Sequence, residues 1–63
     1  METVYEIRKL LKRFGVFIYT GNRVGDLELM EEELRGLYEA KMLDLTTYQK
    51  AILILKREKT NLQ

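Results

Sequence analysis

The stretch Asp26-Leu-Glu-Leu-Met-Glu-Glu-Glu-Leu-Arg-Gly-Leu-Tyr-Glu-Ala40 decides the fold of this 63-residue chain. A helix turns about 100° per residue, and at that turn the main apolar side chains of the stretch fall on one wide arc: Leu27, Met30, Leu34, Leu37 and Tyr38. So much apolar surface predicts a central helix that touches two others, with Gly36 and Ala40 permitting close approach. Asp26 is the expected N-cap, and the helix should run to about Met42.

Two further helices are expected on either side of this one. Thr3-Val-Tyr-Glu6 has the spacing of a capping box, and Gly15 is a natural left-handed stop, which predicts a helix over residues 3–14. Thr46-Thr-Tyr-Gln49 repeats the capping-box logic and predicts a helix over residues 46–60.

The segment 15–25 between the first two helices has no strand to pair with. It is therefore interpreted as an irregular apolar connector that closes one end of the bundle, with Phe17 rather than Tyr19 expected to be buried. The sequence as a whole predicts an all-α fold, a compact three-helix bundle, in a single domain of residues 1–63 with helices at about 3–14, 26–42 and 46–60.

Composition excludes several classes of function. The chain has no cysteine and no histidine, so it lacks disulfides, a thiolate nucleophile, and the commonest general base and transition-metal ligand. No apolar run approaches the roughly 20 residues of a membrane span, and no leader pattern opens the chain. We expect a cytoplasmic protein that is not an enzyme, with no cofactor, metal, membrane or small-molecule partner.

Two motifs favour plain structural interpretations. The acidic side chains of the central stretch, which include Glu28, Glu32 and Glu39, are more typical of a solvated helix face than of an acid–base or metal site. Glu33 lies close to the apolar arc and is expected to pair with a basic residue of a neighbouring helix. Gly21-Asn-Arg-Val-Gly25 lacks the Gly-Lys-Ser/Thr ending of a phosphate loop and is interpreted as a turn.

Charge is segregated along the chain although the net charge is only +1. Residues 1–25 carry a net +3, residues 26–45 a net −5 and residues 46–63 a net +3. In the first helix Arg8, Lys9 and Lys12 follow Tyr5 by three, four and seven residues, which places a ring beside three cations. Such a face could bind a flexible single strand by stacking and phosphate contacts, and the alternative is an ordinary solvated face.

Recognition of duplex DNA by a helix-turn-helix is disfavoured. The recognition helix would begin near Thr46, and the preceding helix, rich in glutamate, would have to cross the DNA backbone. Single-stranded nucleic acid bound by the first and third helices avoids that repulsion.

The string Phe14-Gly-Val-Phe-Ile-Tyr-Thr-Gly-Asn-Arg23, continued by Asp26-Leu-Glu-Leu-Met-Glu-Glu-Glu-Leu34 and Leu37-Tyr38, resembles the YqgQ-like family. The resemblance implies a small cytoplasmic three-helix protein of Gram-positive bacteria with no assigned enzymatic activity and a suggested role in binding single-stranded nucleic acid. It supplies no role for the matching positions Tyr19, Thr20, Gly21 and Arg23. Residues 33–57 more loosely resemble helical hairpins that serve as oligomerisation modules.

The leading hypothesis is a protein that binds single-stranded RNA or DNA through a basic face of the first and third helices. Its tyrosines would stack on bases and its cations would contact phosphates, and the predicted residues are Tyr5, Arg8, Lys9, Lys12, Arg13, Tyr19, Arg23, Lys56 and Arg57. The alternative is a protein–protein adaptor or a regulatory or oligomerisation module, which would present its dipolar surface or an apolar patch around Phe17 and Tyr19.

Overall fold

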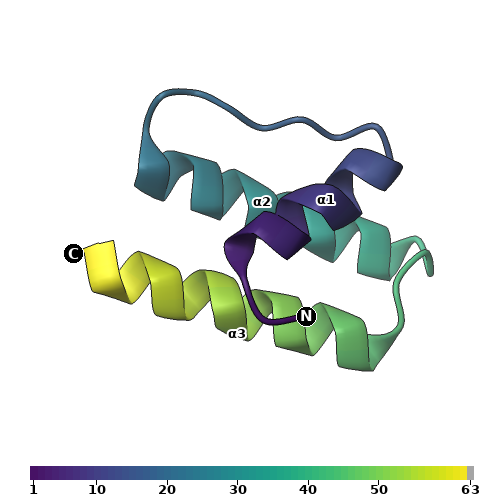
Figure 1. Ribbon diagram of the computed structural model, residues 1–63. Coiled ribbons are helices and arrows are strands. Elements are labelled where there is room, and N and C mark those ends of the chain that lie inside the picture. The colour runs from purple at the N-terminus through teal and green to yellow at the C-terminus, as the bar shows by residue number, and fades with distance from the viewer. Residues whose placement is uncertain (63) are drawn as a thin grey trace.

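A computed structural model describes residues 1–62, and it contains three helices: α1 (Val4–Arg13), α2 (Arg23–Glu39) and α3 (Leu45–Leu62). Helices α2 and α3 form an antiparallel hairpin with the largest interface of the molecule, and α1 packs across one face of that hairpin (Figure 1). The predicted all-α three-helix bundle is confirmed. The last residue of the predicted domain, Gln63, lies outside the described residues.

The core lies where the apolar arcs of the three helices meet. Its buried side chains come from every helix: Ile7 and Leu11 of α1, Leu27, Met30 and Leu34 of α2, and Ala51 and Leu55 of α3. The arc predicted for the central helix therefore faces the core. The expectation for Gly36 and Ala40 is wrong, because both residues are exposed and no heavy atom lies close to where a Cβ of Gly36 would stand.

The two signals that bound α1 act as predicted. The Thr3 hydroxyl accepts a hydrogen bond from the Glu6 amide at 3.2 Å, and the Glu6 carboxylate accepts one from the Thr3 amide at 3.2 Å, which completes the capping box. Gly15, just beyond the helix, has φ +78°, the left-handed conformation that glycine adopts without a steric cost.

Helix α2 begins earlier and ends earlier than predicted. Its cap is Asn22, whose side-chain oxygen accepts from the Gly25 amide at 2.9 Å, so Asp26 lies inside the first turn. The helix ends at Glu39 because Lys41 adopts a left-handed backbone with φ +63°, which cannot continue the helix to Met42.

Helix α3 begins at Leu45 rather than at residue 46. The Asp44 carboxylate accepts from the Thr47 amide at 3.3 Å and takes the capping role that was expected of Thr46. The helix continues to Leu62, slightly past the predicted end.

Ion pairs join α2 to α3. Glu31 of α2 lies 3.8 Å from the Lys56 ammonium and 3.9 Å from the Lys59 ammonium. Glu33 was expected to pair with a basic residue of a neighbouring helix. It is exposed and makes no ion pair within residues 1–62. Glu31 takes that role because its position on the helix turns it toward α3, whereas Glu33 faces away.

The connector follows a different path from the one predicted. It runs along the molecule above α2 and does not close an end of the bundle (Figure 1). Burial alternates along residues 16–20 as in an extended segment, and their path is elongated (Figure 1): Val16 and Ile18 pack against the core while Phe17 and Tyr19 remain 73% and 88% exposed. The expected burial of Phe17 is wrong, because alternation along an extended backbone places it on the same outer side as Tyr19.

Candidate nucleic-acid interface

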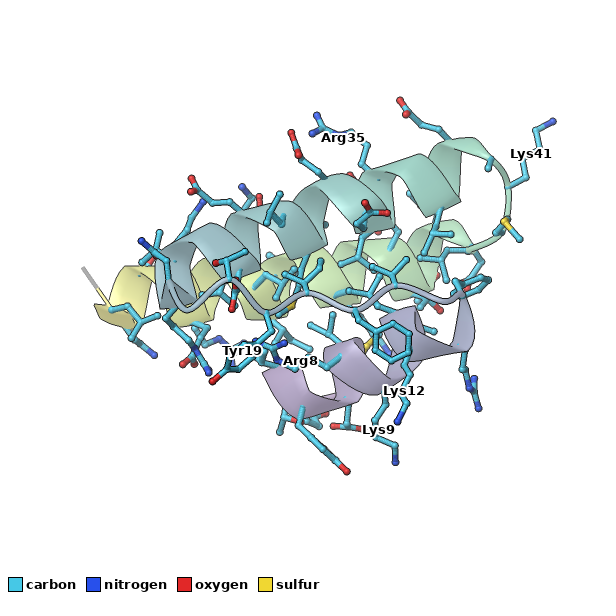
Figure 2. All side chains as sticks on the ribbon, turned by 90° about the horizontal axis from the view of Figure 1, so that it is seen from above. Arg8, Lys9, Lys12, Tyr19, Arg35 and Lys41 are labelled. Carbon is cyan, nitrogen blue, oxygen red and sulfur yellow. The ribbon has the colours of Figure 1, made fainter. Side chains whose placement is uncertain are left out.

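A groove of about 320 Å³ lies between α1 and the extended connector. We call it the α1–connector groove, and its floor and walls are formed by Tyr5, Arg8, Lys9, Leu11, Lys12, Val16, Phe17, Ile18, Tyr19 and Met30. Its lining combines an apolar floor with three aromatic rings and three cationic side chains. Figure 2 shows Arg8, Lys9, Lys12 and Tyr19 gathered on the α1 side of the molecule, away from Arg35 and Lys41.

The α1 wall of the groove carries the free cations. Lys9 stands over the Tyr5 ring, with its ammonium 5.5 Å from the ring centroid, because the two residues are one helical turn apart. Lys9 and Lys12 are exposed, and neither forms an ion pair with a carboxylate in residues 1–62. Their charges are therefore available to an anionic partner.

Arg8 ties the opposite wall of the groove to α1. Its Nη1 donates a hydrogen bond to the carbonyl of Ile18 at 2.6 Å, and its Nη2 lies 3.7 Å from Oδ2 of Asp26. One guanidinium thus holds both the connector and the first turn of α2. Arg8 contributes positive charge to the groove, but its guanidinium is already engaged by the Ile18 carbonyl and by the Asp26 carboxylate.

Asp26 anchors the connector from the other side. Its side chain is buried at 4% exposure, and its Oδ1 accepts hydrogen bonds from both the Thr20 hydroxyl and the Thr20 amide. The hydrogen bonds from Thr20, assisted by the charge of Arg8, hold the pKa of the Asp26 carboxyl below its ordinary value. We call Arg8, Thr20 and Asp26 the clasp, since together they fix where Tyr19 stands.

The clasp makes stability depend on pH. Because the folded-state pKa of Asp26 is lowered, its contribution to the free energy of unfolding is present above about pH 4 and is lost as pH falls through the folded value. The variant Asp26→Asn should be less stable than the wild type near neutral pH, and the gap should narrow in acid. Urea unfolding followed by circular dichroism at several pH values measures this, and a gap that stays constant down to about pH 2 would contradict it. Glu6 and Asp44, whose pKa values are also lowered by local hydrogen bonds, remain in both proteins and act as internal references.

Of the nine residues predicted from the sequence, the groove brings together five and leaves out four. Its lining includes Tyr5, Arg8, Lys9, Lys12 and Tyr19. The other four are Arg13, which lines a separate hollow beside Met1 and Thr47; Arg23, which pairs with Glu58 at 3.1 Å; Lys56, which pairs with Glu31; and Arg57, which lies beside Lys50 and Leu53. Helix α3 contributes none of the groove's lining, so the predicted face shared by the first and third helices is not the surface that this groove forms.

Three residues that shape the groove were not among the nine predicted nucleic-acid-binding residues. Phe17 lines it as an exposed ring, and the strict alternation of Val16-Phe-Ile-Tyr19 was the signal that pairs it with Tyr19. Thr20 and Asp26 hold the connector in place, but no local pattern shows that these two side chains meet.

The described residues were also compared with the requirements of a metal site and of a membrane-spanning helix. Within residues 1–62 no three acidic, histidine or cysteine side chains gather closely enough to hold a metal ion. None of the three helices there has both the length and the apolar character that crossing a membrane requires.

Comparison with known proteins places the chain. The family model described as YqgQ-like matches residues 1–61. The chain is also similar to the uncharacterized protein YqgQ of Bacillus subtilis (strain 168), with 36% identity over 58 residues that cover 92% of this chain and 82% of the relative. The family match spans α1, the connector, the groove, α2 and all of α3 except its last residue, and the chain therefore belongs to the YqgQ-like family.

Proposed function

We propose that the α1–connector groove binds single-stranded nucleic acid, weakly and with little sequence preference, and that the protein acts by binding rather than by catalysis. One observation carries the proposal: three aromatic rings and three cations line one groove on one side of the molecule. Stacking on aromatic rings holds bases of any sequence, and cations beside the rings hold the phosphates between them.

The residues divide between the two tasks. Lys9 and Lys12 contact phosphates because they are exposed and unpaired within the described chain, and Tyr5 and Tyr19 offer exposed rings for stacking. Arg8 adds positive charge while holding the connector. None of the glutamates of α2 lines the groove, and Asp26, which lies beside it, is buried and accepts hydrogen bonds from Thr20, so repulsion of a strand in the groove is small.

A titration of labelled single strands of RNA and DNA at several salt concentrations tests the proposal. With two or three phosphates contacted, the log–log slope should be about −1.4 to −2.1, since each contact releases about 0.7 counterions. Comparison of the two sugars at one salt concentration decides between RNA and DNA. Binding that is absent at low salt, or that is indifferent to salt, would overturn the proposal.

The change Tyr19→Ala separates stacking from charge. Removing the ring should weaken binding by about 1–3 kcal/mol, which is roughly 5- to 150-fold, while the salt slope stays unchanged because no cation is lost. The matched control is Tyr38→Ala. Tyr38 lies outside the groove, where its ring stacks on Tyr48 with centroids 4.7 Å apart. Fluorescence anisotropy measures both, and equal affinities for the wild type and Tyr19→Ala would remove Tyr19 from the site.

A second candidate, the protein–protein adaptor, is favoured by one specific feature. Phe17 and Tyr19 are large aromatic side chains exposed next to each other on the same groove, and exposed aromatic residues are typical of interface centres. Light scattering and affinity capture with purified protein test it. A chain that stays monomeric and captures no partner would count against the adaptor without affecting the nucleic-acid proposal.

A further inference from the structure

The backbone of the connector is tied to the protein at every second residue. The Val16 amide donates to the Leu11 carbonyl at 3.0 Å, and the Ile18 carbonyl accepts from Arg8 at 2.6 Å. The Thr20 amide donates to Asp26 at 2.9 Å. The even-numbered residues therefore face the protein with both their side chains and these backbone groups.

The two residues between them, Phe17 and Tyr19, have unpaired backbone groups. Phe17 and Tyr19 are both exposed, and their backbone N–H and C=O groups form no hydrogen bond within residues 1–62. In an extended segment the backbone groups of alternate residues point to opposite edges. Residues 16–20 thus resemble one strand of a β-sheet, with one edge fastened to the protein and the other edge open. An open edge is a template for another β-strand.

We propose that this open edge pairs with the same edge of a second copy of the chain. In an antiparallel arrangement centred on Ile18, Phe17 of each copy stands opposite Tyr19 of the other and exchanges both its N–H and C=O bonds with it. All four free donors and all four free acceptors of the two copies are then used. The pattern is complementary to itself in this register, which is what a twofold interface requires and what selects a second copy as the occupant.

The side chains support the same pairing. Residues opposite each other in an antiparallel pair share one face of the ribbon, so the Phe17 and Tyr19 rings of the two copies form two cross-strand aromatic pairs, which are among the favourable ones. Because both rings line the α1–connector groove, the grooves of the two copies meet on that face. The pairing stands on the strand edge alone and does not depend on the proposed function.

The size and charge of the interface set how strongly the copies associate. A ribbon of two such short strands is only marginally stable, so the dimer forms at high protein concentration. Pairing also brings Lys9 and Lys12 of one copy toward those of the other, and the resulting repulsion is screened by salt. Added salt should therefore strengthen the dimer, whereas it weakens nucleic-acid binding, and this opposite dependence keeps the two proposals distinguishable.

Sedimentation equilibrium of the full chain without nucleic acid, up to millimolar concentration, tests the pairing together with amide hydrogen exchange. We expect a monomer–dimer equilibrium that shifts toward dimer with salt, and slower exchange at Phe17 and Tyr19 only at high concentration. A chain that stays monomeric throughout, or a dimer that leaves these two amides unprotected, would overturn the proposal.

Two variants at one position sharpen the test. Tyr19→Pro removes the amide donor from each open edge, and with it two of the four hydrogen bonds, so the dimer should be lost. Tyr19→Val keeps the amide and a strand-favouring side chain, so it should retain the dimer. Circular dichroism confirms that each variant is helical. A dimer that survives Tyr19→Pro in a folded chain would overturn the proposed edge.

If Tyr19→Pro disturbs the fold, a measurement on the unchanged chain tests the same pairing. In a mixture of isotope-labelled and unlabelled chains, the register predicts an intermolecular contact between the Ile18 α-protons, because the two Ile18 residues form the close pair at the centre of the ribbon, with Cα atoms about 4.5 Å apart. Dimers that form without this contact would show that another surface joins the copies and would overturn the proposal.

Discussion

Replacing Leu34 by alanine is expected to lower the free energy of unfolding by about 2–5 kcal/mol. Leu34 has no exposed surface at the centre of the core, and truncating such a leucine costs about 2–5 kcal/mol. A 63-residue domain has a total stability of only about 3–9 kcal/mol, at roughly 0.05–0.15 kcal/mol per residue. One substitution therefore removes a large part of what holds the three helices together.

Urea unfolding followed by circular dichroism measures this effect, with Leu53→Ala as the matched control. Leu53 lies on the outer side of α3 and is 63% exposed, so the same chemical change there should alter stability by less than about 0.5 kcal/mol. Equal losses for the two variants would contradict the assignment of Leu34 to the core.

Reversing two charges of the groove is expected to abolish nucleic-acid binding. In the double variant Lys9→Glu, Lys12→Glu, two phosphate contacts disappear, and the lost counterion release alone lowers affinity about 25-fold at 0.1 M salt. Repulsion between the new carboxylates and the phosphates adds to this loss, so the total should reach about 100-fold or more. The slope of log affinity against log salt should become shallower by about 1.4.

The control for this variant changes the net charge equally at another place. Arg35 and Lys41 are exposed, form no ion pair within residues 1–62, and lie away from the groove (Figure 2). The double variant Arg35→Glu, Lys41→Glu should keep most of the affinity. Losses of similar size in both proteins would mean that binding follows net charge and not the groove.

The helices and the core were predictable because their signals are local. The capping box at Thr3 and the left-handed glycine at position 15 act within one turn of helix, and the arc of Leu27, Met30 and Leu34 follows from helical spacing alone. The start of α2 was misplaced for a physical reason. Both Asn22 and Asp26 can cap a helix, and only the path of the connector, which brings Thr20 to Asp26, shows that this carboxylate is already taken.

The candidate site divides in the same way. The grouping of Tyr5, Lys9 and Lys12 follows from helical spacing, and the structure keeps these three residues together on one wall of the groove. Lys56 and Arg57 lie on a helix whose orientation toward α1 depends on how the core packs, and no short pattern in the sequence encodes that orientation. Phe17 was misjudged because apolar character was weighed above the alternation of an extended segment.

The clasp explains how the connector is held in one position although it pairs with no strand. Arg8 and Asp26 belong to different helices, yet both hold backbone groups of the connector, so the wall that carries Phe17 and Tyr19 is fixed from two sides. A groove held open in this way does not have to be ordered by its ligand, which lowers the entropic cost of binding.

Mapping amide chemical shifts during a titration with a short single-stranded oligonucleotide tests the central claim most directly. The account predicts that the perturbed residues cluster along the α1–connector groove, with Tyr5, Lys9, Lys12 and Tyr19 among the largest changes, while Arg57 and the outer side of α3 remain unchanged. Perturbations centred on α3, or an absence of shifts at low salt, would contradict the assignment of this groove as the nucleic-acid-binding surface.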